Sequence, residues 1–451
     1  MKKSFLAGLF LATALAGSAN AQTIFEALSE TYNTNPTLQG QRAYLRSIDE
    51  NVAIAKSGYR PNIALTAAYT DANVSGNSAS ADRDNEQKSI GAKISQPLFS
   101  GFQTVNSVKS ADSQVRAEQS NLYNVEQSVF LDASTAYLNV VRDMAIVNLQ
   151  KNNEKLLKKR LDETQQRFNV GEVTRTDVSQ AKARYSQAKA DRISSEGDLQ
   201  ASKSAYIQII GSEPGELSDP ENIREFLPKS YEEALNYALT HNYGIRQAKS
   251  LLNAKTYDVA AKTGALLPQI TADAAATKTR GEIDLYSGDT TIDNVEWGVN
   301  MTLPLYSSGE TRAKIRQSKY QKWQAQEAVL EAERSTRSSV SSAWEYMQAN
   351  DAKIKSIKDQ VKANEIALDG VQKEEALGNR TILDVLDAYQ ELLNSNVEEV
   401  KARRDYYVSG MNLLLAMGKL TAEDLKLNVD IYQPKKYYKE TRDKWLSLSV
   451  D

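Results

Sequence analysis

The sequence repeats itself once, with matching residues 207 positions apart. The matches run from the beginning of the repeated segment to its end: Ala27 with Ala234, Asn35 with Asn242, Pro61 with Pro268, Gly171 with Gly378, Asp177 with Asp384, and Gly211 with Gly418. Chance similarity does not hold one register over such a length. The period is also too long for a solenoid unit, since those units have about 20–50 residues. The sequence therefore predicts two copies of one architectural half, fused in tandem.

Both halves are predicted to have the same order of elements. A helix comes first, over 24–57 and 231–264, and is followed by a pair of alternating segments at about 62–99 and 269–305. Long helical stretches at 103–168 and 310–376 then lead to a glycine turn and a closing helix. The predicted organisation is a signal peptide at 1–21, a first repeat at 22–211, a linker at 212–230, a second repeat at 231–418 and a C-terminal tail at 419–451.

The long stretch in the first half has the pattern of a single helix. Apolar residues recur at helical spacing from Val125 to Val147, and charged residues follow from Lys151 onward. The chain has only nine prolines, and an interior proline breaks a helix. At about 1.5 Å per residue, a stretch of this length gives a rod of roughly 100 Å. We therefore expect one continuous helix beside two shorter helices that are stacked end to end.

The paired segments alternate between apolar and polar residues, as membrane-spanning strands do. A period of two over about 9–11 residues fits a strand with lipid on one face and water on the other. The residues predicted to face lipid are Ile90, Ile94, Val295, Trp297, Val299 and Met301. The alternative is an ordinary half-buried antiparallel hairpin.

Two hairpins supply only four strands, which cannot close a barrel. An open edge in lipid leaves backbone groups unpaired, so several copies of the chain would have to share one barrel. Two copies would give eight strands and a filled interior, whereas three would give twelve strands and room for water. The strands therefore predict an oligomer if they insert into a membrane.

The N-terminus has the features of a secretory signal peptide. Lys2 and Lys3 precede an apolar run, and Ala19-Asn20-Ala21 has the small-x-small pattern of a cleavage site. The mature chain is expected to begin at Gln22. Removal of the two lysines changes the formal net charge from −3 to −5, and this mild acidity argues against a nucleic-acid partner. No later segment has about 18 consecutive apolar residues, so membrane insertion would have to use strands.

The chemically reactive residue types argue against an enzyme. The chain has no cysteine, and its one histidine is His241. Disulfides, thiolate metal sites and multi-histidine metal sites are therefore excluded. Only His241 could serve as the histidine of a hydrolase triad. We predict no cofactor, no metal site and no catalytic activity. A periplasmic coiled-coil adaptor or scaffold is the alternative to a membrane duct, although an adaptor needs no lipid-facing strands.

The turns that close the long helices carry the most specific motifs. Arg-Phe-Asn-Val-Gly at 167–171 precedes Thr176-Asp177-Val178, and its counterpart runs from Leu377 to Asp387. Pro-Leu-Phe-Ser-Gly and Pro-Leu-Tyr-Ser-Ser-Gly follow the second strand of each half. In this combination, over its whole mature length, the chain resembles the TolC family of outer-membrane efflux and secretion proteins.

The resemblance implies a mainly α fold with a β-barrel portion. Three copies would form a homotrimer whose 12-stranded barrel lies in outer-membrane lipid. A 12-helix α-barrel of long antiparallel coiled coils would continue it across the periplasm. The implied function is a passive exit duct for drug efflux, type I secretion or both. Its implied partners are a periplasmic adaptor (membrane-fusion) protein and an inner-membrane pump of the RND or ABC type, which would open a periplasmic gate on recruitment.

The resemblance places the gate at the glycine turns. Arg380 matches the family's arginine there, and Thr176 and Asp177 match its partners on the neighbouring coil. A guanidinium offers several fixed donors to a carboxylate and a hydroxyl, and it stays charged. Glu375 stands where the best-known members carry a tyrosine, and an ionised glutamate is expected to repel Asp177 instead of donating a hydrogen bond to it. The alternative is that Arg380 and Asp177 are solvated turn residues.

Asp384 and Asp387 are spaced i, i+3, so both can lie on one helix face. They match the family's entrance rings, and threefold symmetry would make two stacked carboxylate rings that favour cations. A pair of solvated helix carboxylates is the alternative. The resemblance also assigns four residues of the periplasmic tips to adaptor contacts: Gly171, Val173, Gly378 and Asn379.

Overall fold

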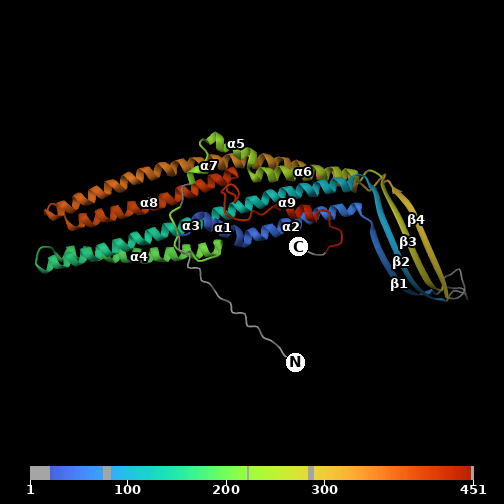
Figure 1. The fold of residues 1–451 in the computed structure, drawn as a ribbon, viewed down its shortest axis with the longest axis horizontal. Helices are drawn as coiled ribbons and strands as arrows, with labels where there is room; N and C mark the ends of the chain where they lie inside the picture. The colour runs from blue at the N-terminus through green and yellow to red at the C-terminus, as the bar shows by residue number, and fades with distance from the viewer. Residues whose placement is uncertain (1–20, 75–82, 221–222, 283–288, 448–451) are drawn as a thin grey trace, which may run out of the picture. The chain divides into compact units, whose positions relative to one another are not determined.

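The computed structural model describes residues 21–74, 83–220, 223–282 and 289–447 (Figure 1). The predicted signal peptide lies outside these residues except for Ala21. The chain forms two compact units, each built from segments of both repeats. The first unit comprises 1–36, 126–234 and 339–430, and the second comprises 37–125, 235–338 and 431–451.

The second unit contains a four-stranded antiparallel sheet in the order β1-β2-β3-β4. Its strands are β1 (Asn62–Val74), β2 (Arg83–Ser100), β3 (Gln269–Glu282) and β4 (Asp289–Thr302). Ile94 lies opposite Ile63 on β1 and opposite Ala274 on β3, and Ala274 lies opposite Trp297 on β4. Apolar residues of all four strands therefore share one face. Among the described residues, β1 and β4 each have one edge without a neighbouring strand.

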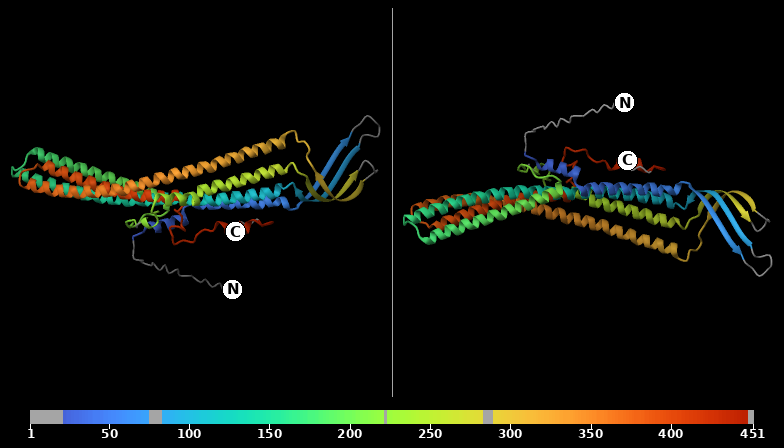
Figure 2. Two further views of the ribbon diagram at one scale, coloured as in Figure 1. Left: turned by 90° about the horizontal axis from the view of Figure 1, so that it is seen from above. Right: turned by 90° about the horizontal axis from the view of Figure 1, so that it is seen from below.

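Two helices of 67 residues dominate the chain: α3 (Gln103–Asn169) and α7 (Glu310–Ala376). Each is uninterrupted, as the low proline content predicts, and at about 1.5 Å per residue is roughly 100 Å long. In the first unit, α4 (Arg175–Ile210) returns along α3, and α8 (Ile382–Met417) returns along α7, so two helical hairpins lie side by side (Figure 2). The mainly helical fold with a strand portion is confirmed.

The prediction of a single helix at the start of each half is wrong, because each half begins with two helices. In the first half, α1 (Ile24–Thr34) and α2 (Pro36–Lys56) are separated by Asn35, whose backbone is extended. A residue before proline disfavours helical geometry, and Pro36 follows. In the second half, α5 (Tyr231–His241) and α6 (Tyr243–Gly264) are separated by Asn242. Its side chain accepts hydrogen bonds from the next helix and so caps it.

The described part of the predicted linker packs against the long helices of the first unit. Tyr137 on α3 donates hydrogen bonds to the carbonyl oxygens of Gln22 and Ser218, both at 2.8 Å. Tyr407 on α8 donates to the carbonyl oxygen of Pro220 at 3.0 Å. A 3₁₀ turn, η2 (Ile223–Glu225), places buried Ile223 beside α8 at Gly410. Buried Tyr137 and half-buried Tyr407 thus hold the connection between the repeats in place.

The C-terminal segment packs against the last turns of α2 and the first part of α3 in the second unit. The short helix α9 (Pro434–Thr441) carries Tyr438, which contacts a buried cluster around Val52 on α2 and Val115 on α3. Tyr438 donates to Asp112 at 2.5 Å, and Lys56 forms an ion pair with Asp443. Both apolar and polar contacts therefore hold this segment in place.

Asp49 lies fully buried on the packed face of α2. Neither of its carboxylate oxygens has a hydrogen-bond partner among the described residues. Burial is the largest cause that raises the pKa of Asp49 to about 7; the charge of Glu50 raises it further, and that of Arg46 opposes the shift. Because a buried ionised carboxylate is costly, this group favours its neutral form in the folded chain.

The raised pKa predicts that the folded state loses stability as the pH rises from about 4 to about 7. In that window the unfolded chain releases the Asp49 proton while the folded chain retains it. Asp49→Asn removes the ionisable group, so its stability relative to wild type should increase with pH. The gain should reach up to about 4 kcal/mol at pH 8. Thermal unfolding followed by circular dichroism at pH 4 and pH 8 measures it, and an equal difference at both values would contradict the assignment.

Candidate gate and channel residues

The two helical hairpins of the first unit end in matching glycine turns. Gly171 has φ 83° and Gly378 has φ 79°, in the left-handed region that favours glycine. The amide of Glu172 donates to the carbonyl of Arg167 at 3.0 Å, and the amide of Asn379 donates to that of Glu374 at 2.9 Å. These bonds satisfy helix-terminal carbonyls. Three of the four predicted tip residues are exposed, namely Gly171, Gly378 and Asn379, and Val173 is half-buried.

The helix that follows each turn begins with a capping box. At the start of α4, Asp177 accepts hydrogen bonds from the backbone and the hydroxyl of Thr174, both at 2.8 Å. At the start of α8, Asp384 does the same with Thr381, at 2.9 and 2.8 Å. These bonds, the backbone bond first, lower the pKa of Asp384, and the charge of Arg380 adds to the effect. A carboxylate has about four acceptor sites, so Asp177 and Asp384 can each still accept hydrogen bonds from other donors.

Arg380 is half-exposed beside its turn and donates from Nε to Glu374 at 2.8 Å. This bond is the largest cause that raises the pKa of the Arg380 guanidinium. Within one chain, the partner of Arg380 is therefore Glu374, on the other side of the same turn. The expected contacts of Arg380 with Thr176 and Asp177 of a neighbouring coil stay a prediction about the assembled protein.

Glu375 faces a partner that the sequence did not suggest. Arg167 donates from Nη1 to Glu375 at 2.7 Å, and the Glu375 side chain is only 14% exposed. This ion pair joins α3 to α7 and so links the two hairpins near their tips. The bond to Glu375 is also the largest cause that raises the pKa of Arg167. Within one chain, a glutamate at this position binds an arginine. Its expected repulsion of Asp177 stays a prediction about the assembled protein.

Two further arginines of the first hairpin also donate hydrogen bonds to residues of the second hairpin. Arg160 on α3 donates to the hydroxyl of Tyr389 on α8 at 3.1 Å, and Arg184 on α4 donates to Asp387 at 2.5 Å. Leu157 on α3, Ala188 on α4 and Leu386 on α8 also form a buried apolar cluster that joins the two hairpins. Arginines of the first hairpin thus reach acceptors on the second over several helical turns.

The family model for outer membrane efflux proteins matches residues 27–212 and 234–419. The chain belongs to the outer membrane efflux protein family. It is 38% identical to outer membrane efflux protein BepC of Brucella suis over 443 residues, with 98% of this chain and 95% of BepC covered. It is 26% identical to outer membrane protein TolC of Escherichia coli, with 94% and 88% covered. The alkaline protease secretion protein AprF of Pseudomonas aeruginosa is 24% identical, with 77% and 73% covered.

Solved outer-membrane channels have the same fold. The outer membrane protein VceC of Vibrio cholerae gives a TM-score of 0.74 at 20% identity and covers 88% of this chain and 96% of its own. The CmeC channel of Campylobacter jejuni gives 0.78 at 16% identity, with 93% and 89% covered. These likenesses agree with the family match. This efflux protein is an outer-membrane protein with a large helical periplasmic part, and its family is one of channels and not of enzymes.

No described helix is both long and apolar enough to cross a membrane. Many of the exposed apolar residues of this efflux protein lie instead on the sheet. All six residues predicted to face lipid are exposed, from Ile94 at 43% to Trp297 at 86%. Contiguous exposed apolar surface marks a site that another phase or partner covers.

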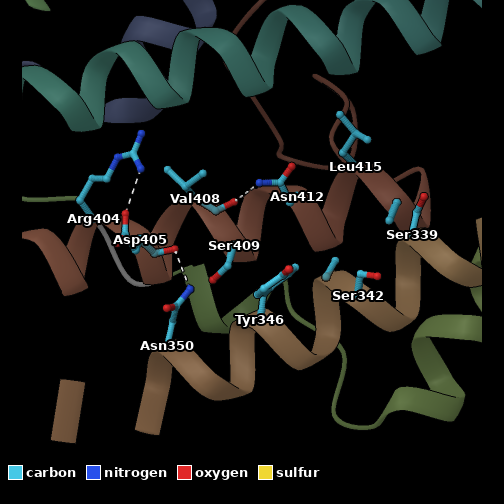
Figure 3. A pocket seen from close by; sticks show the side chains of 12 residues that line it. Ser339, Ser342, Tyr346, Asn350, Arg404, Asp405, Val408, Ser409, Asn412 and Leu415 are labelled. Carbon is cyan, nitrogen blue, oxygen red and sulfur yellow. Dashed lines mark hydrogen bonds and ion pairs between the residues drawn. The ribbon is translucent and has the colours of Figure 1, made fainter. Parts of the chain in front are cut away.

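A hollow of about 510 Å³ lies between α7 and α8 in the first unit (Figure 3). Small side chains, such as Ser342 and Ser409, leave this space open. At its edge Arg404 pairs with Asp405 at 2.9 Å and also donates to Asn139 on α3 at 3.0 Å. The hollow is thus a packing gap along one helical hairpin, on the side where Arg404 reaches toward the other hairpin.

Proposed function

We propose that this efflux protein is the outer-membrane exit duct of a tripartite assembly, and that three copies form one continuous channel. The observation that carries the proposal is the open four-stranded sheet in a chain that also contains two 67-residue helices. Three such sheets supply twelve strands, enough for a barrel with room for water. A periplasmic adaptor and an inner-membrane pump of the RND or ABC type would deliver substrates to the helical end.

Relatives named for efflux and for protease secretion support both classes of cargo. The duct itself would act passively, because it needs only a lumen and a gate. Cells that lack this chain are expected to retain a fluorescent efflux dye and to regain export when wild-type protein is supplied. Normal export without the chain, in cells with no second duct of this family, would overturn the proposed function.

We expect a positive charge to affect stability differently at two adjacent positions of β4, because these positions lie on opposite faces of the sheet. Trp297 is 86% exposed on the apolar face, whereas Gly298 lies on the opposite face across from Asp273. A lysine on the lipid face of a barrel costs about 2–4 kcal/mol near the midplane. Trp297→Lys should therefore destabilise the folded protein in vesicles, lowering its free energy of unfolding by about 2–4 kcal/mol. The matched Gly298→Lys variant should fold nearly as well as wild type, since no atom lies near its added Cβ.

Unfolding in denaturant after reconstitution into vesicles measures both variants. An equal loss for the two positions would show that both faces meet the same environment. That result would contradict the assignment of the odd-numbered face of β4 to lipid. Equal recovery of both variants in the outer-membrane fraction of cells would contradict it in the same way.

A further inference from the structure

The C-terminal segment, here residues 431–447, runs along α2 toward the sheet. Its helix α9 packs against α2 and α3 (Figure 1), and the segment belongs to the second unit. The contacts of the segment, in chain order, join Tyr432 to Arg42, Tyr437 to Glu50, Asp443 to Lys56 and Lys444 to Arg60. Both series of residue numbers rise together, so the segment is parallel to α2 and ends where α2 leads into β1.

Arg60 marks the level at which the chain enters the sheet. It stands two residues before Asn62, the first residue of β1, so at most about 7 Å of chain separates them. In the proposed duct, lipid meets the apolar face of β1 from Ile63 onward. The headgroup layer on each side of a bilayer is about 5–8 Å deep. Arg60 therefore lies within reach of the headgroups of the periplasmic leaflet.

The C-terminal segment presents two large apolar side chains at this level. The Arg60 guanidinium lies over the ring of Trp445, 4.8 Å from its centre, and also donates to the carbonyl oxygen of Lys444 at 3.0 Å. Even so, Trp445 is 66% exposed and the next residue, Leu446, is 92% exposed. Tryptophan is enriched where a membrane meets water, since its ring is apolar and its N–H is polar. The exposed pair is therefore suited to the edge of a bilayer.

The second repeat carries apolar side chains at the matching level without a C-terminal segment. The counterparts of Tyr59 and Arg60, 207 positions later, are Leu266 and Leu267. These leucines are 42% and 39% exposed, immediately before the proline that precedes β3. In the first repeat an arginine occupies this level, and Trp445 of the C-terminal segment covers it. Both repeats thus present exposed apolar groups where their strands begin.

The charge of the segment suits an anionic surface. Residues 434–446 include five basic and two acidic residues, a net charge of +3, although the mature chain is acidic. One of the two carboxylates, Asp443, pairs with Lys56. Basic residues beside an apolar surface favour binding to anionic lipids, and this attraction acts within about 8 Å of the membrane at physiological salt. Arg442 and Lys444 lie at the end of the segment that is nearest the sheet.

We infer that residues 442–446 bind anionic phospholipid headgroups of the periplasmic leaflet. Trp445 and Leu446 enter the interface, while Arg60 and Lys444 meet the headgroup phosphates. The inference rests on the proposed insertion of the sheet, and it adds a second lipid contact outside the strands. It also requires this end of the segment to lie outside the ring of helices. Inside the ring, Trp445 and Leu446 would be surrounded by the water of the lumen.

The absence of cysteine from the chain allows one site to be labelled at a time. Leu446→Cys carries a nitroxide, and the protein is reconstituted into vesicles of phosphatidylethanolamine and phosphatidylglycerol. Power-saturation EPR compares collisions with oxygen, which dissolves in lipid, and with a water-soluble nickel complex. The matched control is Gln433→Cys, an exposed position beside Tyr432, whose partner Arg42 is about 21 Å of helix from Lys56. The preference for oxygen should be severalfold higher at position 446 than at position 433.

A label at Val295→Cys, 77% exposed on the apolar face of the sheet, separates this inference from the proposed duct. Lipid contact at position 295 with water at position 446 overturns the inference and leaves the duct standing. Water at both positions overturns both.

The headgroup charge is tested by a second substitution in the protein labelled at position 446. Lys444→Gln should lower the preference for oxygen in the vesicles that contain phosphatidylglycerol, and it should have little effect in vesicles of phosphatidylcholine alone. Lys435→Gln is the matched control, because Lys435 is exposed at the other end of α9. Equal results for the two variants, or an equal loss in both kinds of vesicle, overturn the binding of anionic headgroups.

Discussion

Neutralising Asp384 and Asp387 together is expected to weaken the block of this channel by multivalent cations about tenfold or more. Both residues lie at the beginning of α8, the first as a capping residue and the second as the partner of Arg184. Three copies around one axis would place six carboxylates near the periplasmic opening. Because Coulomb attraction scales with ion charge, a trivalent ion gains about three times as much as a monovalent ion from each carboxylate.

Asparagine is the better replacement at both positions. Asp384 accepts from the backbone of Thr381, and an asparagine oxygen can still accept that bond. Alanine would remove the cap and loosen the helix end. The double variant Asp384→Asn with Asp387→Asn should therefore keep its fold and lose about tenfold or more in the apparent affinity of the blocking ion.

The measurement is single-channel current while a trivalent cation such as hexamminecobalt is added to the periplasmic side. Asp443→Asn is a suitable control, because it removes a carboxylate from the C-terminal segment, where Asp443 pairs with Lys56. The control should be blocked as wild type is. Block that persists unchanged in the double variant would show that other groups bind the ion, and it would refute the two rings.

Loss of the Arg380 side chain is expected to open the periplasmic end. Within one chain, arginines on the first hairpin already bind acceptors on the second, including Arg167 with Glu375 and Arg184 with Asp387. Shifted by one repeat, the second of these contacts becomes Glu391 against Gln180 of the next copy. Between neighbouring copies this pair of positions would therefore carry no arginine link, and we predict that Arg380 supplies one there.

The expected effect of Arg380→Ala is a conductance or open time that rises roughly three- to a hundredfold. Each exposed pair is weak, but three symmetry-related copies act on the same closed state. Lys373→Ala is the matched control, since Lys373 pairs with Asp369 one turn away on the same helix and cannot link two hairpins. Equal currents from Arg380→Ala and wild type would show that Arg380 is a solvated turn residue.

The sequence predicted the long helices and the alternating strands because both depend on local patterns. The 67-residue helices follow from apolar spacing and scarce prolines, and the exposed row from Val295 to Met301 follows from a period of two. The break at Asn35 was missed, although Pro36 was visible as a signal.

The links between the hairpins could not be derived in the same way. Arg167 lay in a recognised motif, but its bond to Glu375 depends on how α3 and α7 face each other. The pairs Arg160 with Tyr389 and Arg184 with Asp387 join residues more than 200 positions apart. Helical periodicity places each residue on a face of its own helix; it does not state which helix that face meets.

The most direct test of this account is the single-channel conductance of the purified wild-type protein in a planar lipid bilayer. Three open sheets that close into one barrel, with a gate at the glycine turns, predict spontaneous insertion and small, stable openings that prefer cations. Protein that is shown to be folded, yet neither inserts nor carries current, would contradict the membrane duct.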